Sequence, residues 1–148
     1  MLQTWRYLFA AAAVLFLVGV VVQVYLIGAT LFAGHPVDDH RNLGYWLSLA
    51  PVISLLLAWP ARAGQRTVLL CAGLLVTAFV QSVLPGLRDA AGWLAALHPL
   101  NAMLVFGLSL VVARQALRLA GEQAAMPMED PVSSEGQAPS WKRDGSSR

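Results

Sequence analysis

The sequence predicts an all-α integral membrane protein: an antiparallel four-helix bundle built from two repeated helix hairpins. Of its 148 residues, 57% are hydrophobic and only 12% are charged, whereas about 25% are charged in an average soluble domain. The apolar residues form four stretches long enough to cross a bilayer, and none alternates with the period of two that a barrel strand shows. Scarce polar residues also recur at matching positions in the two halves of the chain.

The predicted membrane domain covers residues 1–120, with spans at about 7–33, 40–59, 67–87 and 91–113. In hydrocarbon each backbone group needs a partner within its own segment, so the spans are expected to be helices. The first apolar run is longer than the core of a cleaved signal peptide, and we interpret it as a retained span. The loops between spans are short, which makes neighbouring helices antiparallel.

Three further features refine this outline. Pro36 is expected to open the second helix, with two acids in its first turn, and Pro51 is expected to bend that helix. Residues 121–148 are rich in Pro, Ser, Gly and Glu, and they predict a disordered cytoplasmic tail. The arginines predict a multi-pass protein of the inner (cytoplasmic) membrane with both termini in the cytoplasm. One side of the bilayer would hold Arg6, Arg62, Arg66, Arg114 and Arg118, and the other would hold Arg41 and Arg88.

The composition argues against several classes of function. A net charge of +2 without a dense cluster of Lys and Arg predicts no nucleic-acid partner. Cys71 is the single cysteine, so the chain can form neither an internal disulfide nor a cysteine metal site. No phosphate loop, zinc motif or catalytic triad is present, and no charged side chain is expected inside the membrane. The sequence therefore offers no catalytic residue and favours a protein that is not itself an enzyme.

The polar residues repeat at an offset of 58 positions. Gln23 aligns with Gln81 and His40 with His98, so that each Gln precedes its His by 17 residues. Two such hairpins, related by an axis along the membrane normal, would place the second and fourth helices diagonally across the bundle. The two histidines would then face each other, with the glutamines as a second symmetric pair.

Two facing imidazoles are the arrangement that ligates a heme iron from both sides. Small residues one turn after each histidine, Gly44 and Ala102, would leave room for the porphyrin ring, and Arg41 and Arg88 would pair with its propionates. The sequence therefore predicts one b-type heme with His40 and His98 as metal ligands. One estimate opposes this: with helices starting where we expect, the histidines differ in depth by about one pitch of 5.4 Å.

Other readings of the same residues stay open. The histidines can be solvated or bonded to a free backbone carbonyl, the glutamines can join helices, and the small residues can serve close packing. The chain would then be an accessory or structural membrane subunit without a cofactor. A small transporter or quinone-binding module is the third alternative. Beyond the lipid bilayer, the partners considered are a redox partner or a larger membrane complex.

A resemblance adds to this reading. Gln23, the stretch His40-Arg41-Asn42-Leu43-Gly44, Gln81, and the stretch Leu97-His98-Pro99-Leu100-Asn101-Ala102 together resemble one four-helix half of the heme A synthase family. The resemblance implies axial-ligand roles for His40 and His98. Since this chain has one four-helix unit and not two, heme A synthesis is not implied. Over nearly residues 1–118 the chain also resembles small bacterial four-span membrane proteins of unknown function.

Overall fold

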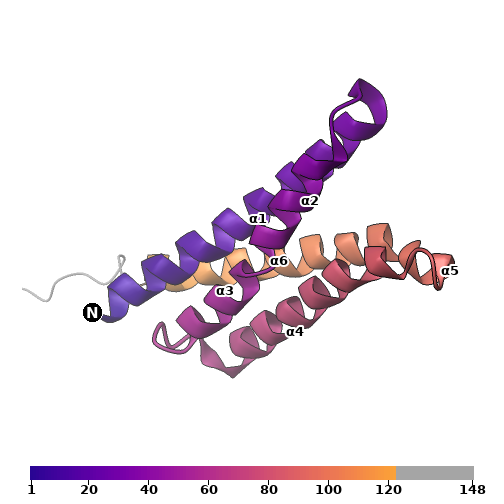
Figure 1. Cartoon of the computed structure of the whole chain (residues 1–148). Helices are drawn as coiled ribbons and strands as arrows, with labels where there is room; N and C mark the ends of the chain where they lie inside the picture. Colours follow the sequence, from indigo (N-terminus) through magenta and orange to yellow (C-terminus); the bar gives the residue numbers. More distant parts are fainter. Residues whose placement is uncertain (123–148) are drawn as a thin grey trace, which may run out of the picture.

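A computed structural model of the chain describes residues 1–122. The described part is all-α, and its helices pack as a four-helix bundle (Figure 1). The bundle predicted from the sequence is therefore confirmed, whereas the internal repeat stays a prediction. The predicted tail, apart from residues 121–122, lies outside the described residues.

The first helical segment is α1 (Leu2–Ala33), which is about 48 Å long at 1.5 Å per residue. It ends at Gly34, whose φ of 69° is left-handed and whose N–H bonds to the carbonyl of Ala29. The second segment consists of α2 (Val37–Leu47) and α3 (Ala50–Ala58). Asp38 and Asp39 lie in the first turn of α2.

The predicted span 40–59 is thus divided into two helices, and Pro51 explains where α2 ends. A proline has no N–H to give to the carbonyl four residues earlier, and its ring collides with that carbonyl. For Pro51 that carbonyl belongs to Leu47, the last residue of α2, and the proline itself lies in the first turn of α3. The break falls at Ser48 and Leu49, before the proline rather than at it.

The third segment is α4 (Gly64–Val83), which continues into the short 3₁₀ helix η1 (Leu84–Leu87). The fourth consists of the one-turn helix α5 (Gly92–Ala95) and α6 (His98–Glu122). Pro99 ends α5 in the same way that Pro51 ends α2. It has no N–H to donate to the carbonyl of Ala95, the last residue of α5. His98 is therefore the first residue of α6, not a residue two turns inside a helix that starts near residue 91.

The helices contact one another in a ring. α1 packs against α6 and against α2 and α3, while α4 packs against α3 and α6. The second and fourth segments therefore lie on opposite sides of the bundle. The buried apolar core is built largely from small side chains that let the helices approach closely, together with a few larger ones, and includes Phe9, Ala10, Ala13, Phe16, Leu74, Val112, Ala113 and Ala116.

This core occupies only one half of the bundle. We name residues 2–20, 50–78 and 105–122 the closed half, and residues 21–49 and 79–104 the open half. In the open half Leu84 alone is buried among the described residues. The ends of the two hairpins, α1–α2 and α4–α6, also diverge from each other in Figure 1.

Three helical stretches are long and apolar enough to cross a membrane, namely Leu2–Ala33, Gly64–Leu87 and Gly92–Glu122. Large apolar side chains on their surfaces are exposed, including Leu15, Phe79 and Leu104. An apolar exterior of this kind is stable against lipid and not against water. The second segment is not among the three, because its break leaves two helices of 11 and 9 residues.

Candidate functional site

The first hairpin brings His40 of α2 onto α1. Its Nδ1 lies 3.1 Å from the backbone carbonyl oxygen of Gln23. A carbonyl oxygen only accepts hydrogen bonds, so Nδ1 carries the proton and donates it. The other ring nitrogen, Nε2, then holds a lone pair, and it has no hydrogen-bond partner within residues 1–122.

The second hairpin repeats this contact at the same separation of 17 residues. Nδ1 of His98 lies 3.1 Å from the backbone carbonyl oxygen of Gln81. That carbonyl is available because the residue four positions later is Pro85, which has no N–H to donate to it. His98 therefore takes up an acceptor that a proline has released, and it too is left with a lone pair on Nε2.

A polar network surrounds His98 that sequence reasoning missed. The Asn101 side-chain amide donates to the carbonyl of Thr77 at 2.9 Å and to Oε1 of Gln81 at 2.7 Å. These two acceptors fix which atom of the Asn101 amide is nitrogen, and they turn Oε1 of Gln81 toward Asn101. Nε2 of Gln81 then faces Nε2 of His98 at 3.1 Å and donates to its lone pair. The available signal was spacing, since Asn101 follows His98 by three residues and shares its helix face.

The two imidazoles lie together between the hairpins. Their ring centroids are 6.4 Å apart and the ring planes are inclined at 77°. The estimated difference in depth assumed a fourth helix that starts near residue 91, whereas α6 starts at His98. Two imidazoles bound to one iron, each by a nitrogen at about 2 Å, would have centroids about 6 Å apart.

Gln23 differs from its counterpart in the second hairpin. Both its side-chain nitrogen and its side-chain oxygen are buried and have no hydrogen-bond partner among residues 1–122. The position 58 residues before Asn101 is Leu43, which has no polar atom to offer. A Cβ added at Gly44 would come within 3.2 Å of Nε2 of Gln23, so Gly44 provides the space in which this amide lies.

The remaining predicted site residues lie near the histidines in sequence but make other contacts. Nη1 of Arg41 forms an exposed ion pair with Asp38 at 3.0 Å, within α2. Arg88 is exposed and follows η1. Ala102 lies half-buried in the first turns of α6. Within residues 1–122 no group of three or more His, Cys, Asp or Glu side chains could hold a metal ion, which leaves the histidine pair as the metal-ligating candidate.

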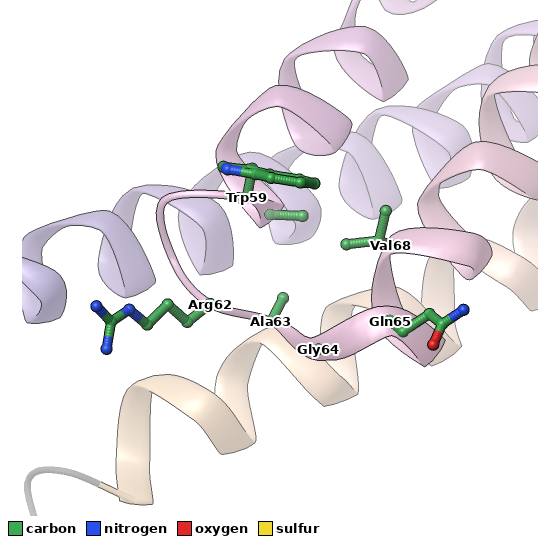
Figure 2. A pocket seen from close by; sticks show the side chains of 7 residues that line it. Trp59, Arg62, Ala63, Gly64, Gln65 and Val68 are labelled. Atoms are coloured by element: carbon green, nitrogen blue, oxygen red, sulfur yellow. The ribbon is translucent and has the colours of Figure 1, made fainter.

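The closed half contains two surface hollows of about 440 and 300 Å³ near the α3–α4 loop. Figure 2 shows the smaller one, with Trp59, Gln65 and Val68 around it and the Arg62 side chain directed away. Neither hollow is lined by a His, Cys, Asp or Glu. They lack the groups that general acid–base or metal chemistry requires.

Fold and helix composition together define a multi-pass membrane protein with a helical bundle. Residues 23–91 are similar to the family of unknown function DUF6220. This match contains Gln23, His40 and Gln81 and ends before His98. No curated protein and no solved structure matches the chain.

Proposed function

We propose that the bundle binds one b-type heme between His40 and His98, and that it serves electron transfer or heme handling. The observation that carries the proposal is the imidazole pair itself. Its centroid separation of 6.4 Å fits two ligands of one iron, and each Nδ1 is held by a backbone carbonyl. Metal-ligating histidines generally donate their second ring N–H to such an acceptor, which orients the ring and fixes the tautomer.

The surroundings of the pair support a flat apolar ligand. Apart from Leu84, no described residue of the open half is buried as a whole, so a porphyrin would supply apolar contacts that this half lacks. The unpartnered amide of Gln23 is a hydrogen-bonding group left over for a ligand or for bound water. Arg41 and Arg88 are the proposed partners of the propionates, with Arg41 exchanging Asp38 for a propionate.

Held by His40 and His98, a heme would supply one-electron chemistry. The chain's own part is to orient the two rings, to shield them with apolar helices and to hold a proton on each Nδ1.

The accessory-subunit alternative also has an observation in its favour. Gln81, His98 and Asn101 form a satisfied set of interhelical hydrogen bonds, as packing residues in membrane helices do. This reading accounts for the second hairpin, but it leaves the two unpartnered atoms of Gln23 without a reason. It predicts that both histidine variants assemble normally and that the wild type has no heme.

The experiment is a reduced-minus-oxidised spectrum of the full chain, expressed with ample heme and purified in detergent, with heme quantified as the pyridine complex. We expect about one heme per wild-type chain and a lower or altered signal in His40→Ala and His98→Ala. His35→Ala is the matched control: this third histidine is exposed in the loop after α1 and should leave the spectrum unchanged. A wild type without heme, or a control as impaired as the pair variants, would reject the proposal.

For the topology we propose a bacterial-type cytoplasmic membrane with both termini on the cytoplasmic side. The closed half ends in arginines, and Arg6 is anchored there by donating to the backbone carbonyls of Ala61 and Leu119. Positive residues near helix ends favour the cytoplasmic side. Reporter fusions at each terminus test this orientation, and activity of a periplasm-specific reporter at either end would contradict it.

A further inference from the structure

The two histidines occupy different environments although each hairpin presents its histidine in the same way. Nε2 of His40 has no hydrogen-bond partner within residues 1–122, whereas Nε2 of His98 accepts a hydrogen bond from the Gln81 amide. That amide is in turn held by Asn101, whose own amide is tied to the backbone at Thr77. His98 therefore has a competing partner for the lone pair that an iron would need.

We propose that His40 is the fixed axial ligand and His98 the displaceable one, so that a small neutral ligand such as carbon monoxide replaces His98 on the reduced iron. This inference rests on the proposed heme site. When His98 leaves the iron, its lone pair regains the Gln81 amide, which lowers the cost of leaving. The described first hairpin makes no such bond to Nε2 of His40: the Gln23 amide is not bonded to it, and Leu43 stands where the second hairpin has Asn101 to orient the amide.

The direction of the effect follows from this competition. Removing the competing donor leaves His98 with the iron as its only partner, which strengthens that bond relative to the displaced state. One neutral hydrogen bond corresponds to a factor of about three to ten in such an equilibrium. Gln81→Leu and Asn101→Leu should therefore each lower the affinity for carbon monoxide by about threefold to tenfold.

The test is a carbon monoxide titration of the full chain loaded with hemin and reduced with dithionite. Gln65→Leu is the matched control, since it makes the same exchange at an exposed residue of the closed half, and its affinity for carbon monoxide should equal that of wild type. His98→Ala should bind carbon monoxide more tightly than wild type and yield the same absorption spectrum of the complex. Equal affinities for wild type, Gln81→Leu and Asn101→Leu would overturn the inference while leaving the heme site intact.

A second measurement needs no heme. In the metal-free protein, ¹⁵N NMR should report a hydrogen-bonded acceptor at Nε2 of His98, and Asn101→Leu should shift this signal without moving that of His40. An unchanged His98 signal would overturn the inference even if a variant fails to load heme. A wild type that binds no hemin would instead overturn the proposed function, and the inference with it.

Discussion

The closed and open halves of the bundle are made from the same helices but are built differently. In the closed half, small and aromatic side chains of α1 and α6 are buried against each other, with Ala116 and Phe9 fully enclosed. In the open half the described residues supply a single buried residue, Leu84, and hydrogen bonds join His98 to Gln81 there. The first half holds most of the buried core, and the second holds the histidine pair.

This difference shows where the protein gives up stability. Close packing in a membrane contributes through many weak contacts between helices. The open half forgoes these contacts. Buried polar atoms without a partner among the described residues occur in both halves, at Gln23 in the open half and at Gln3 and Ser54 in the closed half, and each such group costs about 1–3 kcal/mol. The predictions below separate the two halves by their effects on binding and on unfolding.

The largest expected effect is on binding. His40→Ala should weaken hemin binding by more than about 100-fold. Removing only the hydrogen-bonding partner of a ligand typically costs about 10–100-fold in affinity, and removing the ligand itself should cost more. The variant's unfolding midpoint in the absence of heme should stay close to that of wild type. Titration with hemin and unfolding of the heme-free protein in mixed detergent micelles measure the two quantities. A drop in both would mean that the open half also holds the fold together.

An overpacking variant in the closed half should have the opposite profile. Ala116 is 0% exposed in the α1–α6 core, so Ala116→Leu should lower the free energy of unfolding by about 1–3 kcal/mol. Hemin affinity of the folded fraction should be unchanged. Ala33→Leu, at the exposed end of α1, adds the same atoms in the open half and should cost nothing measurable. Equal losses in the two variants would contradict the division into halves.

The two glutamines should respond with opposite signs. Gln81→Leu removes a donor and an acceptor that His98 and Asn101 use, and it should destabilise the heme-free protein by about 1–2 kcal/mol. Gln23→Leu removes two buried atoms without partners, and it should stabilise by about 1 kcal/mol. Chemical unfolding of both variants in the same detergent compares them directly. Destabilisation by Gln23→Leu would mean that its amide has a bound partner even without heme.

The smallest effect is expected from Leu43→Asn. This change supplies the first hairpin with the amide that the second has at Asn101, and it should raise the free energy of unfolding by about 0.6 kcal/mol, a typical value for a hydrogen bond between membrane helices. Asn101→Leu is the reverse exchange and should lower it. The same unfolding assay resolves the pair, and a loss of stability in both would show that the two hairpins do not place these positions alike.

Much of the fold was accessible from the sequence, and the reasons for the errors are local. The four apolar stretches predict the four segments, because about 20 consecutive apolar residues form a helix as long as the hydrocarbon core is thick. The breaks near Ser48 and Ala96 were not placed, although Pro51 and Pro99 each fall four residues after the last residue of a helix. A proline interrupts the helix before it rather than at its own position. The same rule at Pro85 would have pointed to the free carbonyl of Gln81.

The candidate site was accessible only in part. His40, His98, Gln23 and Gln81 stand out in the sequence because imidazole and amide groups are scarce and costly among apolar residues. Asn101 does not stand out, because polar residues are common near helix ends. Its role becomes visible only when its neighbours in the structure are known. The predicted pairing of Arg41 with a ligand competes with an Asp38 contact that lies on the same helix.

The sequence by itself determined that this chain is a membrane-embedded helical bundle, since hydropathy and length act on each segment separately. It also determined which side chains are too polar to lie in lipid without a partner. Only the tertiary structure decided that the ring centroids of His40 and His98 lie 6.4 Å apart. It also decided that, within residues 1–122, Nε2 of His98 accepts a hydrogen bond from an amide and Nε2 of His40 does not. Those relations depend on where helices break and how they cross, which is set by contacts between residues far apart in the chain.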